Sequence, residues 1–225
     1  MRTRLVGTVM LLSLGIALRA WAGAQGKGQC QFPGDGVDGP ALRYRTQSNG
    51  TVTDLNTGLM WEMKDRENGI HSVNRTFTWS ALLSTGVCSE TAPNGTVFTV
   101  FLDTLNHTCA GDETTACTKN ADCQHIGNGQ CGYAGHRDWR IPNFKELQSI
   151  VDYGIIQTSQ TFQPAIDPTF GPTRAPEEDR YWTFTTDALH PTTALFVNFD
   201  NGFVSTPDCK SFALLVRAVR DRQCQ

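Results

Sequence analysis

The chain has 225 residues and a formal net charge of −3. Three of its 19 basic residues lie in an N-terminal leader, so the remainder would carry 16 basic against 22 acidic residues. This mildly acidic balance argues against a nucleic-acid-binding protein and against a generic polyanion-binding face.

The first 22 residues have the pattern of a Sec-type signal peptide. Arg2 and Arg4 precede an apolar stretch over Leu5–Leu18, and Ala20-Trp21-Ala22 supplies the small-x-small cleavage signal. We expect cleavage after residue 22, with residue 24 as the alternative, and an extracytoplasmic location, either periplasmic or secreted. No later stretch of about 18 apolar residues follows, so we expect no membrane span. Residues 23–43, rich in glycine, glutamine and proline, form a lead-in segment.

Eight cysteines follow the leader, an even number that predicts disulfides in an exported chain. They are Cys30, Cys88, Cys109, Cys117, Cys123, Cys131, Cys209 and Cys224. No C-x-x-C pair occurs, which argues against zinc, and we expect neither a metal nor a cofactor. Residues 109–131 contain four of the cysteines and few hydrophobic residues, so we interpret them as a disulfide-stapled surface insertion. Calcium binding by Asp112, Glu113 and Asp122 is the alternative, but their spacing is irregular and favours a solvated acidic loop.

The first elements expected are two short strands and two helices. Segments 51–55 and 59–63 flank Asn56-Thr57-Gly58 and predict a hairpin, with Trp61 facing the core. Segment 78–83 has the pattern of a short helix with Trp79, Leu82 and Leu83 on its apolar face. Segment 98–105 fits either a helix or a strand, and we favour the helix.

The central stretch 138–153 predicts the best-defined helix of the chain. Asn143 stands at the N-cap position and Glu146 follows three residues later, which is the capping-box pattern. Phe144, Leu147, Ile150 and Val151 recur at helical spacing on one face. An ion pair between Asp138 and Arg140 is expected to fix the corner that precedes this helix.

The C-terminal half predicts an antiparallel sheet. After a long loop over 154–180, strands are expected at 181–185, 194–199, 202–205 and 214–219, followed by the tail 222–225. Asn201-Gly202, between two alternating segments, is the strongest hairpin signal of the chain. Strands, short helices and a final antiparallel sheet in this order define an α+β fold.

Several of these segments resemble the Lcl C-terminal domain family, named after the Legionella collagen-like adhesin. The matching stretches are NGTVTD from Asn49, TGLMW from Thr57, DWRIPN from Asp138, PAID from Pro164, Tyr181-Trp182, VNF from Val197 and VRAVR from Val216. The resemblance covers roughly residues 44–221 and implies an exported bacterial domain with a C-type-lectin-like antiparallel sheet, two or three short helices and no established catalytic residues.

The namesake adhesin trimerises and binds sulfated glycosaminoglycans, and this chain departs from it in three ways. No collagen-like repeat precedes the domain, and the charge balance is acidic. Ala218 stands where members often carry a cysteine, so the resemblance implies Cys209 or Cys224 as the partner of Cys88. The oligomeric state stays open.

No catalytic motif stands out, and we expect no enzyme. Neither a Gly-x-Ser-x-Gly elbow nor a His-Glu-x-x-His motif occurs. His136 and Asp138 lie two residues apart on an extended segment, and Glu177, Glu178 and Asp179 are interpreted as a solvated run. An uncharacterised hydrolase is therefore the weakest hypothesis.

The predicted function is an exported, non-catalytic recognition domain with adhesin-like glycan binding. Aromatic rings can stack on sugar faces, and polar groups beside them can bind hydroxyls. The candidate binding residues are Tyr181, Trp182, Asn198, Asp200 and Asn201. At each position the alternative is a structural role. The aromatic residues, together with Phe199, would then lie in the core, and Asp200-Asn201 would form a simple turn. A protein-partner module and a structural envelope protein are the alternative functions.

Overall fold

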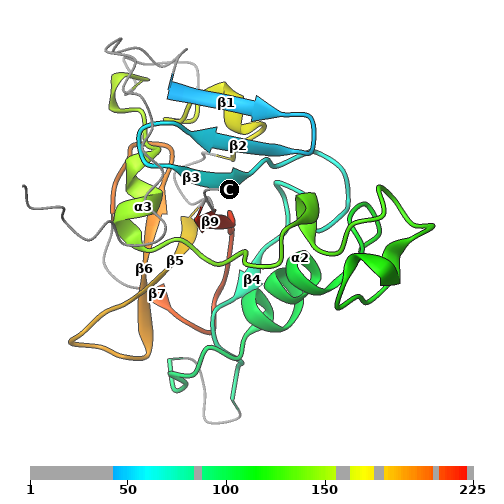
Figure 1. Cartoon of the computed structure of the whole chain (residues 1–225). Coiled ribbons are helices and arrows are strands. Elements are labelled where there is room, and N and C mark those ends of the chain that lie inside the picture. Colours follow the sequence, from blue (N-terminus) through cyan, green and yellow to red (C-terminus); the bar gives the residue numbers. More distant parts are fainter. Residues whose placement is uncertain (1–42, 84–87, 156–162, 175–179, 205–207, 222–225) are drawn as a thin grey trace, which may run out of the picture.

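Figure 1 presents a computed structural model that describes residues 43–83, 88–155, 163–174, 180–204 and 208–221. The expected leader, residues 23–42 and the tail lie outside these residues, as do Cys30, Cys224 and the acidic run Glu177–Asp179. Within the described residues, no helix has the length and apolar character that a membrane span requires.

A four-stranded antiparallel sheet joins the two ends of the domain (Figure 1). Its strands, in the order β1-β2-β3-β9, are β1 (Tyr44–Gln47), β2 (Thr51–Asp54), β3 (Leu59–Glu62) and β9 (Val219–Asp221). The expected hairpin is confirmed as β2 and β3, and Trp61 is fully buried. Because β9 pairs with β3, the last strand of the domain completes the sheet that the first three begin.

The remaining strands form two smaller antiparallel sheets. One has the order β5-β6-β7 and contains β5 (Arg180–Thr186), β6 (Thr193–Asn198) and β7 (Asp208–Cys209). The other pairs β4 (Phe77–Thr78) with β8 (Ala213–Leu214). The single strand expected over 214–219 is therefore divided into β8 and β9, with Leu215 bridging to Tyr181 between them.

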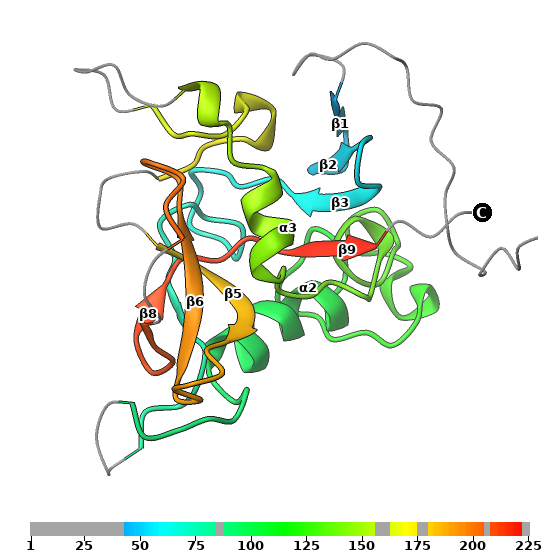
Figure 2. The same cartoon turned by 90° about the vertical axis from the view of Figure 1, so that its left-hand side faces the viewer.

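The helices are short, and together with the sheets they give an α+β fold. A π-helix over Val97–Leu102 continues into α2 (Asp103–His107), which confirms the helix expected over 98–105. The central helix is α3 (Phe144–Ser149), and it packs against β5 and β6 (Figure 2). Its capping box is present, with Asn143 accepting from the Glu146 N–H at 2.9 Å and Glu146 accepting from the Asn143 N–H at 2.7 Å. Single 3-10 turns occur at Asn120–Cys123, Tyr133–Gly135, Tyr153–Ile155 and Pro168–Phe170.

Two hydrophobic clusters form the core. One gathers Trp61, Leu147, Phe170, Tyr181 and Phe199 between the four-stranded sheet, α3 and β5–β6. The other gathers Trp79, Phe101, Trp139, Trp182 and Val216 around the π-helix and α2. Residues from both halves of the sequence contribute to each cluster, so neither half has a core of its own.

The expected helix over 78–83 is wrong. Thr78 lies in β4, and the chain from Trp79 to Leu83 has no helix. Trp79 is buried and its indole N–H donates to the Thr183 carbonyl at 3.2 Å, whereas Leu82 is 64% exposed. The tertiary contacts of β4 with β8 and of Trp79 with β5 override the local helical spacing.

The expected ion pair between Asp138 and Arg140 is also wrong, because each residue has another partner. Arg220 donates to both carboxylate oxygens of Asp138, at 2.6 and 3.1 Å. Arg140 donates to both oxygens of Glu146 at 2.8 Å and also reaches Asp221. Bidentate arginine–carboxylate pairs of this kind fix geometry as well as charge. Here they fasten the DWRIP segment to β9 on one side and to the start of α3 on the other.

A buried ionic network lies at the end of β3, centred on Glu62. One oxygen of Glu62 accepts from the Lys64 ammonium and from His71, both at 2.8 Å, and the other accepts from the Ala218 N–H at 2.9 Å. The guanidinium of Arg217 donates to the Glu62 carbonyl at 2.8 Å. Burial alone would raise the pKa of Glu62, but the Lys64 ammonium and His71 outweigh it and lower that pKa to about 2.

We expect Glu62→Gln to destabilise the domain by about 3–5 kcal/mol, since it leaves the Lys64 ammonium and Arg217 buried without an opposite charge. Urea unfolding of the two proteins at pH 7 measures the difference. Glu67→Gln, at an exposed position two residues beyond Asp65, is the matched control and should change stability by less than about 0.5 kcal/mol.

The same network predicts a dependence of stability on acid. The Glu62 pKa is about 2 in the folded state and about 4.5 for an ordinary glutamate carboxyl, so its stabilisation is fully present above about pH 4.5. That stabilisation is lost as the pH falls toward 2. The glutamine variant should therefore lose less stability than the parent chain between these pH values, and equal losses would contradict the role of Glu62.

Candidate functional site

Three of the five candidate residues are buried. Tyr181 and Trp182 are 1% and 0% exposed. The Tyr181 hydroxyl bonds to the Arg174 main chain, and the Trp182 indole N–H donates to the Phe77 carbonyl at 2.9 Å. Asn198 is 5% exposed, and its side-chain oxygen accepts from the Asp200 N–H at 2.6 Å. Asn198 therefore shapes the turn that follows it, Tyr181 and Trp182 belong to the core, and none of the three side chains presents a ring or amide at the surface.

The other two candidates, Asp200 and Asn201, reach the surface in a tight turn after β6. The Asn198 N–H donates to the Phe203 carbonyl at 3.1 Å, and Val204 bridges back to Val197. The hairpin expected at Asn201-Gly202 is thus present as a turn, followed by a single bridge rather than a strand. The side-chain oxygen of the exposed Asn201 accepts from the Phe203 N–H at 2.8 Å, so this oxygen shapes the turn, and the amide nitrogen is a hydrogen-bond donor.

Tyr153, which sequence reasoning did not select, packs on this turn. Its hydroxyl donates to the Gly202 carbonyl at 3.3 Å and accepts from the Gln148 side-chain amide at 2.9 Å. A Cβ at Gly202 would lie 2.6 Å from the Tyr153 ring, and Gly202 has φ +68°. Both the close approach and the backbone conformation therefore require glycine at this position.

Gln148, Tyr153, Asp200, Asn201 and Phe203 together form a patch that we call the turn surface. The Tyr153 ring is 47% exposed and Phe203 is 60% exposed. Figure 2 shows that the turn lies at the end of β6 opposite to the β5–β6 connection, on the side where the chain leaves α3. Two half-exposed aromatic residues thus accompany an amide donor, an amide oxygen and a carboxylate. Tyr153 and Gln148 were not selected from the sequence, because Tyr153 contacts the turn across 49 positions of the chain. No local sequence pattern indicates a contact over that separation.

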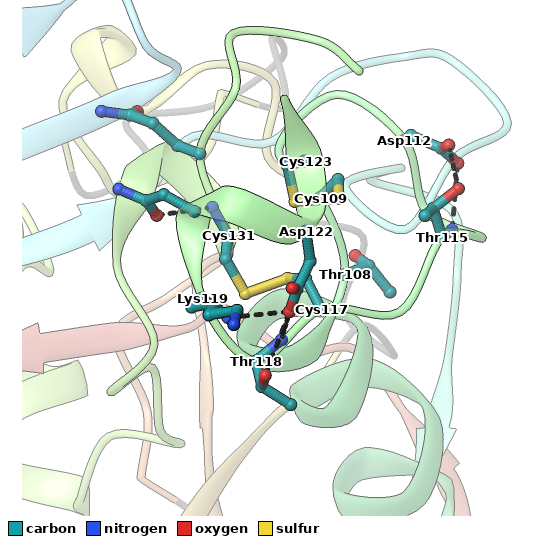
Figure 3. Close-up of a disulfide and its surroundings, with 12 residues drawn as sticks. Thr108, Cys109, Asp112, Thr115, Cys117, Thr118, Lys119, Asp122, Cys123 and Cys131 are labelled. Carbon is teal, nitrogen blue, oxygen red and sulfur yellow. Dashed lines mark hydrogen bonds between the residues drawn. A yellow bond between two sulfur atoms is a disulfide. The ribbon is translucent and has the colours of Figure 1, made fainter. Parts of the chain in front are cut away.

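The cysteine-rich insertion is held by two adjacent disulfides, Cys109–Cys123 and Cys117–Cys131 (Figure 3). The sulfurs of Cys109, Cys117 and Cys123 lie within 4.8 Å of one another because these two bonds stack, so their closeness has a covalent explanation. The third described disulfide joins Cys88 to Cys209, one of the two partners that the resemblance left open.

The carboxylates of the insertion have structural partners. Asp112 accepts hydrogen bonds from Thr114 and Thr115, which lower its pKa to about 2. Asp122 accepts from Thr118 and from the Lys119 N–H (Figure 3). The Glu113 carboxylate reaches back to the Ile70 N–H at 2.6 Å. The three acidic residues considered for calcium thus each stabilise the loop or tie it to the domain.

Histidine–carboxylate pairs occur at three places, and none includes a nucleophile. The rings of His71, His107 and His190 contact Glu62, Asp103 and Asp187 respectively, at 2.7 or 2.8 Å. Within the described residues, no hydroxyl or thiol side chain bonds to any of these rings. The first pair belongs to the buried network, and the other two are exposed pairs within one helical turn or one loop.

The Lcl C-terminal domain family matches residues 50–220, which is most of the chain. The chain therefore belongs to this family, as the sequence motifs indicated. No curated protein and no solved structure matches the chain. The family and the disulfides are consistent with an extracytoplasmic domain.

We expect Gly202→Ala to destabilise the domain by about 1–2 kcal/mol, because alanine at φ +68° is strained and its Cβ meets the Tyr153 ring. Near-ultraviolet circular dichroism should report a changed Tyr153 environment. Gly154→Ala is the control, since Gly154 has no left-handed conformation and its Cβ would lie 3.0 Å from a carboxylate oxygen. Equal stability of the Gly202→Ala variant and the parent would contradict the close packing of Tyr153 on the turn.

Proposed function

We propose that this protein is an extracytoplasmic, non-catalytic recognition domain that binds a glycan at the turn surface. The observation that carries the proposal is the joint exposure of Tyr153 and Phe203 beside the Asp200-Asn201 turn. A sugar presents a C–H face that stacks on an aromatic ring and hydroxyls that pair with amide and carboxylate groups. We also infer a C-type-lectin-like arrangement of the sheets, which the resemblance suggests.

Two further observations support a binding role over catalysis. The most perturbed buried carboxylate, Glu62, is 0% exposed and bonds to Lys64, His71 and the Ala218 N–H, so a substrate has no access to it. The exposed histidine pairs lack a nucleophile within the described residues. These arrangements support structural roles for the titratable groups, whereas at the turn surface polar groups lie beside exposed aromatic residues.

A protein partner is the second candidate, favoured by a separate aromatic cluster. Phe184 is 53% exposed, and its ring lies 5.9 Å from that of Trp79 and 6.3 Å from that of Phe98. Exposed aromatic residues on a packed base are typical anchors of protein interfaces. This cluster lies on β5 and the π-helix, so substitutions there and at the turn surface distinguish the two functions.

The proposal predicts that Phe203→Ala and Asn201→Ala each weaken glycan binding by about fivefold or more, since a few central contacts carry most of the binding free energy of a small site and about 1 kcal/mol corresponds to about fivefold. A glycan array followed by calorimetry on the best ligand measures this loss. Leu189→Ala is the matched control, because Leu189 is 84% exposed in the connection at the opposite end of β5 and β6. Undiminished binding in the Phe203 and Asn201 variants, or loss only in a Phe184→Ala variant, would move the site away from the turn surface.

A further inference from the structure

The charges around the turn surface restrict the ligand that it accepts. Asp200 is half-buried, and within the described part of the chain its carboxylate takes part in no hydrogen bond or ion pair. Asp152, beside Tyr153, uses one oxygen to accept from the Gly154 N–H at 2.8 Å. A ligand at this surface therefore meets an unneutralised carboxylate at the turn and a second one close along the chain.

Two arginines that approach this end of the molecule, Arg180 and Arg43, are already neutralised. Arg180, opposite Asn198 in the sheet register, is paired with Asp208. Arg43 donates to the Ser149 carbonyl next to Gln148, and its guanidinium is bound by both oxygens of Asp54, at 2.8 and 3.1 Å. Lys145, one helical turn before Gln148 on α3, is exposed and is the nearest basic residue along the helix. The turn itself thus offers no guanidinium to a sulfate or a carboxylate group.

We propose that the turn surface takes a glycan without anionic groups and prefers one that carries free amino groups. This inference rests on the proposed glycan-binding function and adds the class of sugar. An ammonium beside Asp200 gains a charge-assisted hydrogen bond, whereas a sulfate there meets a like charge in a site without a counter-charge. The aromatic rings serve neutral and amino sugars equally, so the Asp200 carboxylate supplies the preference.

The test compares three oligosaccharides of matched length on the full mature chain: a glucosamine oligomer, an N-acetylglucosamine oligomer and a heparin-derived fragment. We expect the glucosamine oligomer to bind tightest, the acetylated oligomer less tightly and the heparin fragment least. Raising the salt concentration should weaken only the first of these interactions, because it screens the attraction to Asp200.

Asp200→Asn isolates the carboxylate, and its fold is expected to survive because the carboxylate has no partner to lose. The variant should bind the glucosamine oligomer about two- to fivefold more weakly, because one partly exposed charge pair contributes little to affinity. Its affinity for the acetylated oligomer should change by less than about twofold. Asp187→Asn is the matched control, since Asp187 binds His190 at the opposite end of β5 and β6.

The outcomes distinguish failure of the amino-sugar preference from failure of glycan binding itself. Tightest binding of the heparin fragment, lost in Lys145→Gln, would overturn the preference for amino sugars and leave glycan binding standing. An unchanged preference in Asp200→Asn would also overturn it. Binding of none of the three oligosaccharides, nor of any other array sugar, by folded protein would reject glycan recognition itself and this inference with it.

Discussion

The buried guanidinium of Arg217 is the interaction on which the rest of the domain depends. It donates to the carbonyls of Glu62 and Phe170, at 2.8 and 2.9 Å, and to the Thr173 hydroxyl at 3.0 Å. One side chain near the C-terminus thus holds β3 and the 3-10 turn at Pro168–Phe170 in place. A buried charge is tolerated only when its hydrogen-bond partners are supplied, so these segments must assemble together. The Glu62 carboxylate makes a second link between β3 and this C-terminal segment, because it accepts a hydrogen bond from the Ala218 N–H.

This arrangement explains why the family motifs carry so little information about the ligand. The charged residues of these motifs have partners inside the scaffold: Glu62 pairs with Lys64, Asp138 with Arg220, and Arg140 with Glu146. Charged groups that are already paired within the scaffold are not available to bind a ligand. Membership of the family therefore defines the framework, and the proposed recognition depends on side chains between the motifs, among them Tyr153 and Phe203.

The features that the sequence predicted correctly are those that neighbouring residues decide. A Gly-containing loop between two short strands gave the β2–β3 hairpin, and Asn143 with Glu146 gave the cap of α3. Low hydrophobicity and four cysteines marked the insertion. The errors lie where distant contacts decide, as at 78–83, where pairing with β8 draws Thr78 into a strand. The candidate residues follow the same rule, because Tyr181 and Trp182 of β5 face the core, while Tyr153 comes to the turn from beyond α3.

The turn surface also illustrates what a scaffold contributes to binding. The turn is fixed by the side chains of Asn198 and Asn201, which each accept a main-chain N–H within two residues, and by the Tyr153 hydroxyl on the Gly202 carbonyl. A ligand that stacks on Tyr153 meets a ring already immobilised by Gly202 and Gln148. Association then orders fewer side chains, and less of the interaction free energy is lost to entropy. A small, half-polar surface gains affinity from such preorganisation, because it has little apolar area to bury.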